Sequence, residues 1–260
     1  FVIIDNRQKV TELSKEQIIK ICDRNFIGCD QLIFIEKDNT ADARLKFFNS
    51  DGGESGACGN GTRCVANLIS KENCKKNIIL ATLSGNLKSK ILENNLVTTE
   101  IGKAKTKWSE IPLSNELNTL NLNIQINDKK NNAYFGGTAV NVGNPHVIFF
   151  VDEIQNFDIS IIGPQLEVHK TFPEKCNVTI AQIFNKNLIK VKVWERGAGL
   201  TKACGTAACA TAFAGKLNNL TDNNTDIEFG TGKLSIFIDE KNSIHMKGPV
   251  SDIKEISIKL

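Results

Sequence analysis

The stretch Ser55-Gly56-Ala57-Cys58-Gly59-Asn60-Gly61-Thr62-Arg63-Cys64 organises the chain, because a second copy of its pattern follows at Leu200-Thr201-Lys202-Ala203-Cys204-Gly205-Thr206-Ala207-Ala208-Cys209. Both copies read Ala-Cys-Gly, then one small polar residue, then a second cysteine a few positions later. Each follows a turn rich in glycine and acidic residues and leads into an apolar segment. The central cysteines lie more than half the chain apart, roughly one domain length. This pattern predicts an internal duplication with one reactive cysteine in each half.

A cysteine just before a helix has a chemical consequence. The first turn of a helix carries unpaired N–H groups and the positive end of the helix dipole, which favour a thiolate. We therefore expect the thiol pKa of Cys58 and Cys204 to lie below the usual value of about 8.5. The glycines that follow, Gly59 and Gly205, leave backbone N–H groups uncovered for a substrate carboxylate.

A free cysteine on its own is more often a small buried hydrophobe than a catalytic group. The repeated glycine-rich context favours chemistry for Cys58 and Cys204. Their neighbours Cys64 and Cys209 fall inside the predicted helices, where core packing is the preferred interpretation. The other cysteines show no partner pattern and are assigned no chemistry; they are Cys22, Cys29, Cys74 and Cys176.

Composition narrows the class of protein. The chain has 260 residues, 32 Lys and Arg against 29 Asp and Glu, and a formal charge of +3, which is too balanced to indicate a nucleic-acid or membrane partner. Eight cysteines without a C-x-x-C pair argue against a zinc ribbon or a secreted disulfide framework. We expect a cytoplasmic protein without a transmembrane helix, signal peptide, metal or cofactor. The start at Phe1, without Met, suggests that the natural N-terminus is missing.

Periodicity predicts many short strands around few helices. A capping box at Ser14 and Gln17 predicts a helix to about Arg24. Further helices are expected from Cys58 to about Lys71, around Ile161 to Val168 and after Cys204. Strands are expected at residues 1–5, 31–36, 44–49, 77–82, 87–92, 96–101, 120–126, 132–142, 147–151, 177–184, 188–194, 227–234, 235–238, 245–247 and in the tail 253–260, with a tight turn at Asn144-Pro145-His146.

These elements indicate an α+β protein with two pseudo-symmetric lobes, each a mostly antiparallel sheet wrapped around a central buried helix. Five of the eight residues 207–214 are Ala, and a helix that is apolar on all sides is buried on all sides. We place the N-terminal lobe at 1–104 plus 250–260 and the C-terminal lobe at 105–249. The active site is expected in the cleft between them.

Three other functions fit the motifs less well. A P-loop is excluded because Thr62, not Lys, follows Gly61. A cysteine hydrolase with a histidine partner would leave the duplication unexplained. A non-catalytic module that binds an anion through the two glycine loops would not need cysteines with a lowered pKa.

Several motifs together resemble the diaminopimelate epimerase family of cofactor-independent amino-acid epimerases, over essentially the whole chain. They are Phe48-Asn49-Ser50-Asp51-Gly52, Ala57 to Cys64, Gly143-Asn144-Pro145-His146, Phe172-Pro173-Glu174 with Asn177, and Glu195 to Gly199 leading to Ala203-Cys204-Gly205-Thr206. Proline and hydroxyproline racemases share the fold and the two-cysteine plan, but their cysteine loops read differently, and they are the nearest alternative.

The resemblance implies that Cys58 and Cys204 are two bases that interconvert LL- and meso-diaminopimelate, in lysine and peptidoglycan precursor biosynthesis. It implies backbone contacts to the reacting carboxylate, a set of side chains that contact the remainder of the substrate, and two residues that tune the thiols. The implied carboxylate contacts are Gly59, Asn60, Gly205 and Thr206. The implied contacts to the remainder of the substrate are Gln31, Asn49, Asn144, Asn177, Glu195 and Arg196. The residues implied to tune the thiols are His146 and Glu195. A homodimer is one assembly consistent with the family.

The chain departs from the family pattern in two places. The family usually has Gly-Asn-Asp just before the position of Phe1, so one substrate-binding Asn is absent from this sequence. Leu200 stands where Glu is more usual, which affects no role assigned above.

Overall fold

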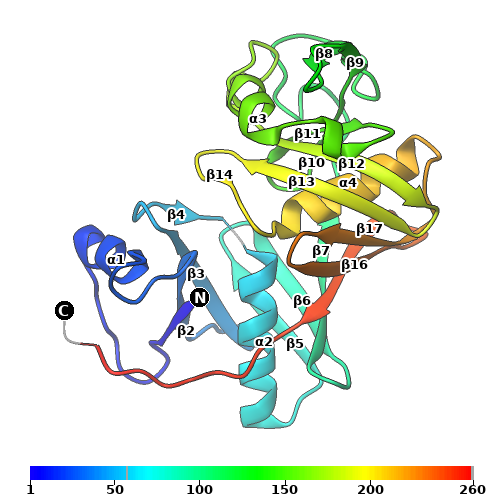
Figure 1. Ribbon diagram of the computed structural model, residues 1–260. Helices are drawn as coiled ribbons and strands as arrows, with labels where there is room; N and C mark the ends of the chain where they lie inside the picture. The colour runs from blue at the N-terminus through cyan, green and yellow to red at the C-terminus, as the bar shows by residue number, and fades with distance from the viewer. Residues whose placement is uncertain (57, 259–260) are drawn as a thin grey trace. The chain divides into compact units, whose positions relative to one another are not determined.

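The computed structural model describes residues 1–56 and 58–258. The chain divides into two compact units, one formed by Phe1–Glu100 with Gly248–Leu260 and the other by Ile101–Lys247 (Figure 1). Each unit combines parallel and antiparallel strand pairs with a few helices, so the predicted α+β class is confirmed. The part of the tail predicted as a strand at 259–260 lies outside the described residues.

The N-terminal unit is built from strands and two helices. In chain order they are β1 (Val2–Asp5), α1 (Lys15–Cys22), β2 (Gln31–Glu36), β3 (Ala43–Asn49), β4 (Glu54–Ser55), α2 (Gly59–Asn73), β5 (Asn77–Thr82), β6 (Gly85–Ile91) and β7 (Leu96–Lys103). Helix α1 begins at the predicted capping box, in which the Ser14 side chain accepts from Gln17 N and the Gln17 side chain accepts from Ser14 N. Such reciprocal caps satisfy backbone donors that a helix leaves unpaired.

Helix α2 packs one face against the sheet of its unit. Its residues Val65, Ala66 and Ile69 are buried in one cluster with side chains from β2, β3 and β5. The first turn lies so close to the sheet that a Cβ on Gly61 would come within 2.7 Å of Ile33 Cδ1. This close approach explains why glycine occupies that position.

The C-terminal unit repeats this plan with additional strands. Its elements are β8 (Ile124–Asn127), β9 (Ala133–Gly136), β10 (Thr138–Asn141), β11 (Pro145–Phe150), a 3₁₀ turn η1 (Ile154–Asn156), α3 (Ile159–Glu167), β12 (Asn177–Asn185), β13 (Leu188–Glu195), β14 (Gly199–Leu200), α4 (Gly205–Leu217), β15 (Asn224–Phe229), β16 (Gly232–Ile238) and β17 (Ser243–Pro249).

Helix α4 is the centre of the larger core, as its alanine-rich sequence predicts. Every residue from Ala207 to Gly215 is buried. The small side chains pack in one cluster with Ile148 of β11, Ile227 of β15 and Ile236 of β16, among others. Small residues bring the helix close to the surrounding strands, which is how a helix without a polar face is accommodated.

The two units share the same pattern of pairing among their core strands. In the first, β1–β2 and β3–β5 are parallel pairs, and β2–β3, β5–β6 and β6–β7 are antiparallel. In the second, β11–β12 and β13–β15 are parallel, and β12–β13, β15–β16 and β16–β17 are antiparallel. The short strands β4 and β14 each pair with the strand before them. The internal duplication predicted from the two cysteine motifs is therefore present in the fold.

Several predicted boundaries are wrong for local reasons. The turn before β11 falls at residues 142–144, and Pro145 and His146 already belong to the strand. Proline is tolerated there because it is the first residue of the strand. The single strand predicted at 132–142 is two strands, β9 and β10, separated by Gly137 at φ +101°.

The remaining corrections concern the C-terminal third. The strand predicted at 227–234 is divided by the Gly230-Thr231 turn between β15 and β16. The described part of the tail, residues 253–258, forms no strand, and Ile253 and Ile256 are exposed. Alternating residues form a strand only where a partner strand is available.

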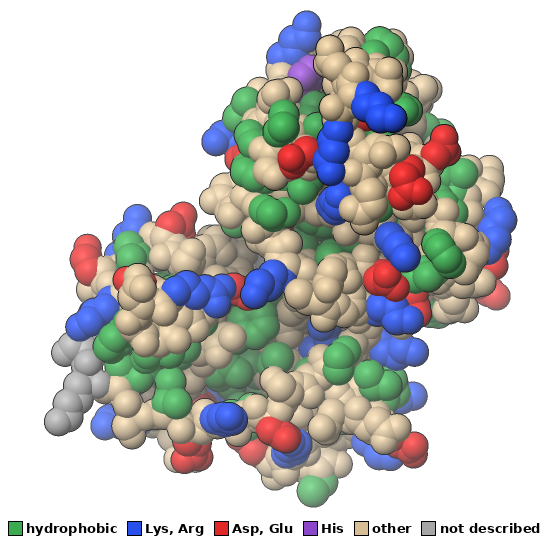
Figure 2. Space-filling view, viewed as in Figure 1, with side chains coloured by type: hydrophobic (Ala, Val, Ile, Leu, Met, Phe, Trp, Pro, Cys, Tyr) green, Lys and Arg blue, Asp and Glu red, His purple; other side chains and the backbone are tan. Residues whose placement is uncertain are grey.

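The surface carries mixed charge. Lys, Arg, Asp and Glu side chains are interspersed on the face shown in Figure 2. Within the described part of the chain, no helix combines the length and apolar character needed to span a bilayer. These observations agree with the near-neutral composition.

Candidate active site

Cys58 occupies the N-cap of α2, immediately before Gly59. Its backbone is extended, at φ −143° and ψ 109°, and its Sγ accepts a hydrogen bond from Gly61 N at 3.4 Å. Its carbonyl accepts from Thr62 N and from Thr62 Oγ1. The sequence thus places the sulfur at the N-terminus of the helix, the positive end of the dipole, as predicted.

Burial outweighs these contacts at Cys58. It raises the thiol pKa to about 11, although hydrogen bonds from Gly61 N and Asn60 N and the charge of Arg63 act in the opposite direction. The expected lowering of the pKa is therefore wrong for this state of the protein. Loss of hydration disfavours the charged form of the thiol more than the helix end favours it.

Two other predicted residues of this unit lie next to each other. Gln31, the first residue of β2, donates from Nε2 to Oδ1 of Asn49, the last residue of β3, at 2.8 Å. The two residues are paired across the strands. Asn60 lies in the first turn of α2, where its Oδ1 is buried without a hydrogen-bond partner among the described residues. An unpaired buried acceptor is costly unless a ligand or water supplies a donor.

Cys204 occupies the same position at the second helix. It is the N-cap of α4, with φ −134° and ψ 117°, and it is 5% exposed. Its carbonyl accepts from Ala208 N, and its Sγ lies 3.4 Å from Thr206 Oγ1. The duplicated motif therefore produces duplicated cysteine geometry.

The electrostatic environment of Cys204 differs from that of Cys58. Burial raises the pKa of Cys204 well above its usual value, and the Glu195 carboxylate raises it further through its charge and a hydrogen bond. The Thr206 hydroxyl and Ala207 N act in the opposite direction. The expected lowering is again wrong, because a buried thiol beside a carboxylate retains its proton.

A chain of hydrogen bonds leads from a buried histidine to Cys204. His146 Nε2 bonds Asn144 Oδ1 at 2.8 Å, and Asn144 Nδ2 donates to Thr206 Oγ1 at 3.5 Å. Because an amide oxygen only accepts, Nε2 carries the imidazole proton. Burial and the charge of Arg196 lower the pKa of His146 to about 3, so the ring is neutral near pH 7. His146 is thus a neutral hydrogen-bond donor that orients the side chain of Asn144.

Arg196 lies at the exposed end of the turn after β13. Its N donates to Oδ1 of the buried Asn177 at 3.0 Å, and its Nη1 donates to the carbonyl of Glu174 at 2.9 Å. Asn177 also donates from Nδ2 to the Pro145 carbonyl. Asn177 thus braces the turn that carries Arg196, and these hydrogen bonds do not reach Cys204.

Sequence reasoning missed Glu167, the last residue of α3. Its carboxylate accepts from Trp194 Nε1 at 2.7 Å and from Gly197 N at 3.0 Å. The signal available in the sequence was an acidic residue at a predicted helix C-terminus, where the dipole favours a basic one.

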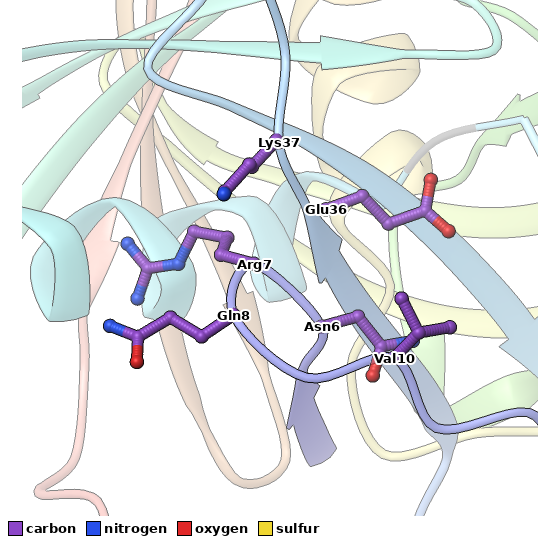
Figure 3. Close-up of a pocket in the computed structure, with 6 residues that line it drawn as sticks. All are labelled: Asn6, Arg7, Gln8, Val10, Glu36 and Lys37. Atoms are coloured by element: carbon purple, nitrogen blue, oxygen red, sulfur yellow. The ribbon is translucent and has the colours of Figure 1, made fainter.

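A surface pocket elsewhere in the N-terminal unit does not include the predicted residues. It is lined by Asn6, Arg7, Gln8, Val10, Glu36 and Lys37, whose side chains point in different directions (Figure 3). Arg7 is already engaged by Asp5 at 2.6 Å and Glu72 at 2.8 Å. Its charge is therefore compensated.

Comparison with known proteins gives one consistent family. A family model described as diaminopimelate epimerase matches residues 1–107 and 138–253. The chain is 67% identical over 260 residues to a diaminopimelate epimerase of Pelagibacter ubique (strain HTCC1062), covering 100% of this chain and 95% of that protein. It is 39% identical over 256 residues to a diaminopimelate epimerase of Acidiphilium cryptum (strain JF-5), covering 98% and 91%.

Solved structures share the fold at lower identity. A probable proline racemase from Agrobacterium radiobacter K84 matches with a TM-score of 0.66 and 10% identity, over 99% of this chain and 90% of that chain. A phenazine biosynthesis protein from Bacillus anthracis matches with a TM-score of 0.65 and 17% identity, over 95% and 90%. At such identities the likeness shows the shared architecture.

Proposed function

The chain belongs to the diaminopimelate epimerase family, and on that premise we propose that Cys58 and Cys204 are its two acid–base groups. The activity is the interconversion of LL- and meso-diaminopimelate in lysine biosynthesis. One observation carries the residue assignment: each cysteine is the N-cap of the helix that holds the same place in the two matching units. A role in core packing alone would not explain why both cysteines occupy this repeated N-cap position.

The reaction inverts one carbon centre by exchanging its proton. One cysteine, as thiolate, takes the α-proton from one face and becomes a thiol. The electron pair remains on the α-carbon and its carboxylate. The other cysteine, as thiol, delivers its proton to the opposite face and becomes the thiolate. Thiol, thiolate and charge balance, and the enzyme finishes with the roles of the two cysteines exchanged.

The carbanion intermediate requires stabilisation at the carboxylate. The first N–H groups of α2 and α4, contributed by Gly59, Asn60, Gly205 and Thr206, supply donors where charge develops. These groups belong to the elements that carry the cysteines, so donors and bases are positioned together. A substrate carboxylate bound there would exclude water from the site. Without water, the attraction between the N–H groups and the developing negative charge is stronger.

The two thiols start from different environments. Arg63 favours the thiolate of Cys58, whereas Glu195 favours the thiol of Cys204. A protein with one thiolate and one thiol is what a two-base reaction requires before each turnover. Burial keeps both thiols protonated in this structure, so we assign to Cys58, the more readily ionised of the two, the role of the thiolate when substrate binds, and to Cys204 the role of the thiol.

The distal end of the substrate carries a second amino-acid group with both charges. Arg196 offers a planar guanidinium suited to a carboxylate. Gln31, Asn49, Asn144 and Asn177 offer amide donors and acceptors. We assign these side chains to binding, with Asn177 acting in part by holding the Arg196 backbone.

The experiment that tests the function uses LL-diaminopimelate in heavy water, without added pyridoxal phosphate or metal. The meso product formed early should carry deuterium at the inverted carbon, because the delivering thiol holds a solvent-derived deuteron. Unreacted substrate should keep its α-proton. Early product that keeps the original proton would contradict two bases, and a protein that only binds substrate would give no exchange.

Two coarser assignments accompany this one. We place the enzyme in the cytoplasm, where its biosynthetic substrate is formed, and we propose a homodimer as its assembly. Light scattering coupled to size exclusion measures the molar mass directly, and a monomer at assay concentration would contradict the dimer.

A further inference from the structure

We propose that Glu167 is a positioning residue that holds the turn carrying Glu195 and Arg196 in its substrate-binding geometry. The inference rests on the proposed function of those two residues. Glu167 itself is separated from the reacting groups by the turn, so its effect would be transmitted through the backbone of residues 194–197.

Glu167 brackets the turn from both sides. Its Oε2 accepts from the Trp194 indole Nε1 at 2.7 Å, and its Oε1 accepts from Gly197 N at 3.0 Å. Glu195 and Arg196 are the two residues between these anchor points. A carboxylate is the side chain that accepts two such bonds at once, and bonds to a charged acceptor are the stronger ones.

The Glu167 carboxylate lies at an energetically unfavourable position, the C-terminal end of α3. Glu167 is the last residue of α3 and is 9% exposed. The negative end of the helix dipole and the loss of hydration both oppose a buried carboxylate there. The nearest cation, Lys175 Nζ, is 3.9 Å from Oε1. The bonds to the turn are what offset this cost.

Packing fixes the direction of the indole. A Cβ on Gly163 of α3 would lie 2.4 Å from Trp194 Cγ, so the helix backbone lies directly against the side chain. The indole is thus packed against α3, and its Nε1 is directed at Glu167. Helix, indole and carboxylate form a rigid support for the turn.

The turn depends on this support because the backbone at Gly197 has several accessible conformations. Gly197 lies at φ +74°, a conformation reached easily by glycine, so the backbone bond from Gly197 N selects one of several accessible geometries. Arg196 is held on the other side by Asn177 and by the Glu174 carbonyl. Without Glu167, the peptide between Arg196 and Gly197 can rotate, and the guanidinium moves with it.

The test compares Glu167→Gln with Glu116→Gln in the epimerase assay. Glutamine keeps one acceptor but turns an NH₂ group toward an N–H donor, so one of the two bonds is lost. Glu116 is an exposed carboxylate of the same unit and is the matched control. We expect Glu167→Gln to lower kcat/KM about tenfold or more, mainly through KM, as a displaced binding group does. Glu116→Gln should match the unaltered protein, and Trp194→Phe should give a smaller loss.

A second comparison, made in a protein that already carries Arg196→Lys, separates a positioning role of Glu167 from general loss of stability. In an Arg196→Lys protein the grip on the substrate is already weakened, so adding Glu167→Gln should change KM by less than about threefold. The inference is overturned if the full effect persists in that background, if Glu167→Gln matches the control, or if lost activity equals the fraction of unfolded protein by circular dichroism. An unaltered protein that fails to epimerise would instead refute the proposed function.

Discussion

Glu195 holds the place in the C-terminal unit that Asn49 holds in the N-terminal unit. Each is the last residue of the strand that leads into a cysteine loop, β13 in one case and β3 in the other. The core strands are therefore duplicated but the charge is not: a carboxylate stands on one side and a neutral amide on the other. This difference makes the two thiols chemically distinct.

The first prediction concerns Glu195→Gln. Removing the carboxylate removes a charge and a hydrogen bond that raise the pKa of Cys204, so that pKa should fall while the pKa of Cys58 stays unchanged. The measurement is the alkylation rate of each cysteine as a function of pH, followed by peptide mass spectrometry. Glu116→Gln is the control, and equal shifts at both cysteines would contradict the assignment.

The second prediction concerns the bases themselves. Cys58→Ser and Cys204→Ser should each lower epimerisation about a hundredfold or more, since a serine hydroxyl is a poor acid–base group at neutral pH. Serine is also a favoured N-cap, so α2 should keep an acceptor for Gly61 N and neither helix should lose its first turn. Circular dichroism should therefore match the unaltered protein. Either variant with full turnover would show that its cysteine is not a base.

The third prediction separates packing cysteines from catalytic ones. Cys209 of α4 is fully buried in the core, whereas Cys64 of α2 is half-buried. Cys209→Ala should cost about 1 kcal/mol of unfolding free energy and Cys64→Ala less, because a buried truncation leaves a cavity. Denaturant unfolding measures both. Loss of turnover in a folded Cys209→Ala protein would mean that this residue has a chemical role.

Local sequence was sufficient for the parts of the fold that depend on local chemistry. The Ser14 capping box, the alanine-rich α4 and the two Ala-Cys-Gly motifs each specify their structure within a few residues. They identified both helices that carry the cysteines. The Gly137 interruption was less visible, because its cause is the approach of Val147 and Phe149 from another strand, which the sequence around Gly137 does not contain.

The thiol pKa shifts could not be predicted in the same way. A helix N-terminus is visible in sequence, but the depth at which Cys58 and Cys204 are buried is a property of the assembled core. Glu167 was missed for a related reason: its bonds to Trp194 and Gly197 join residues about 30 positions apart. Only the packing of α3 on β13 brings those groups together.

The fourth prediction uses the buried histidine. The pKa of His146 is about 3 in the folded protein, against an ordinary value of 6.5. Between these values the unfolded state binds a proton that the folded state does not, so stability rises with pH. The contribution of His146 is fully present above about pH 6.5 and is lost as pH falls, at up to about 1.4 kcal/mol per pH unit.

The measurement is denaturant unfolding between about pH 6.5 and 5.5, where carboxyl groups with ordinary pKa values near 4 remain mostly ionised. His146→Gln is the matched variant, since its amide N–H can still donate toward Asn144 and it does not titrate. The variant should lose less stability over this range than the unaltered protein. His169, whose pKa is also lowered by burial, contributes equally to both proteins and cancels in the comparison. Parallel stability curves would show that His146 is protonated in the folded state, and the neutral hydrogen-bond donor assigned to it would then be wrong.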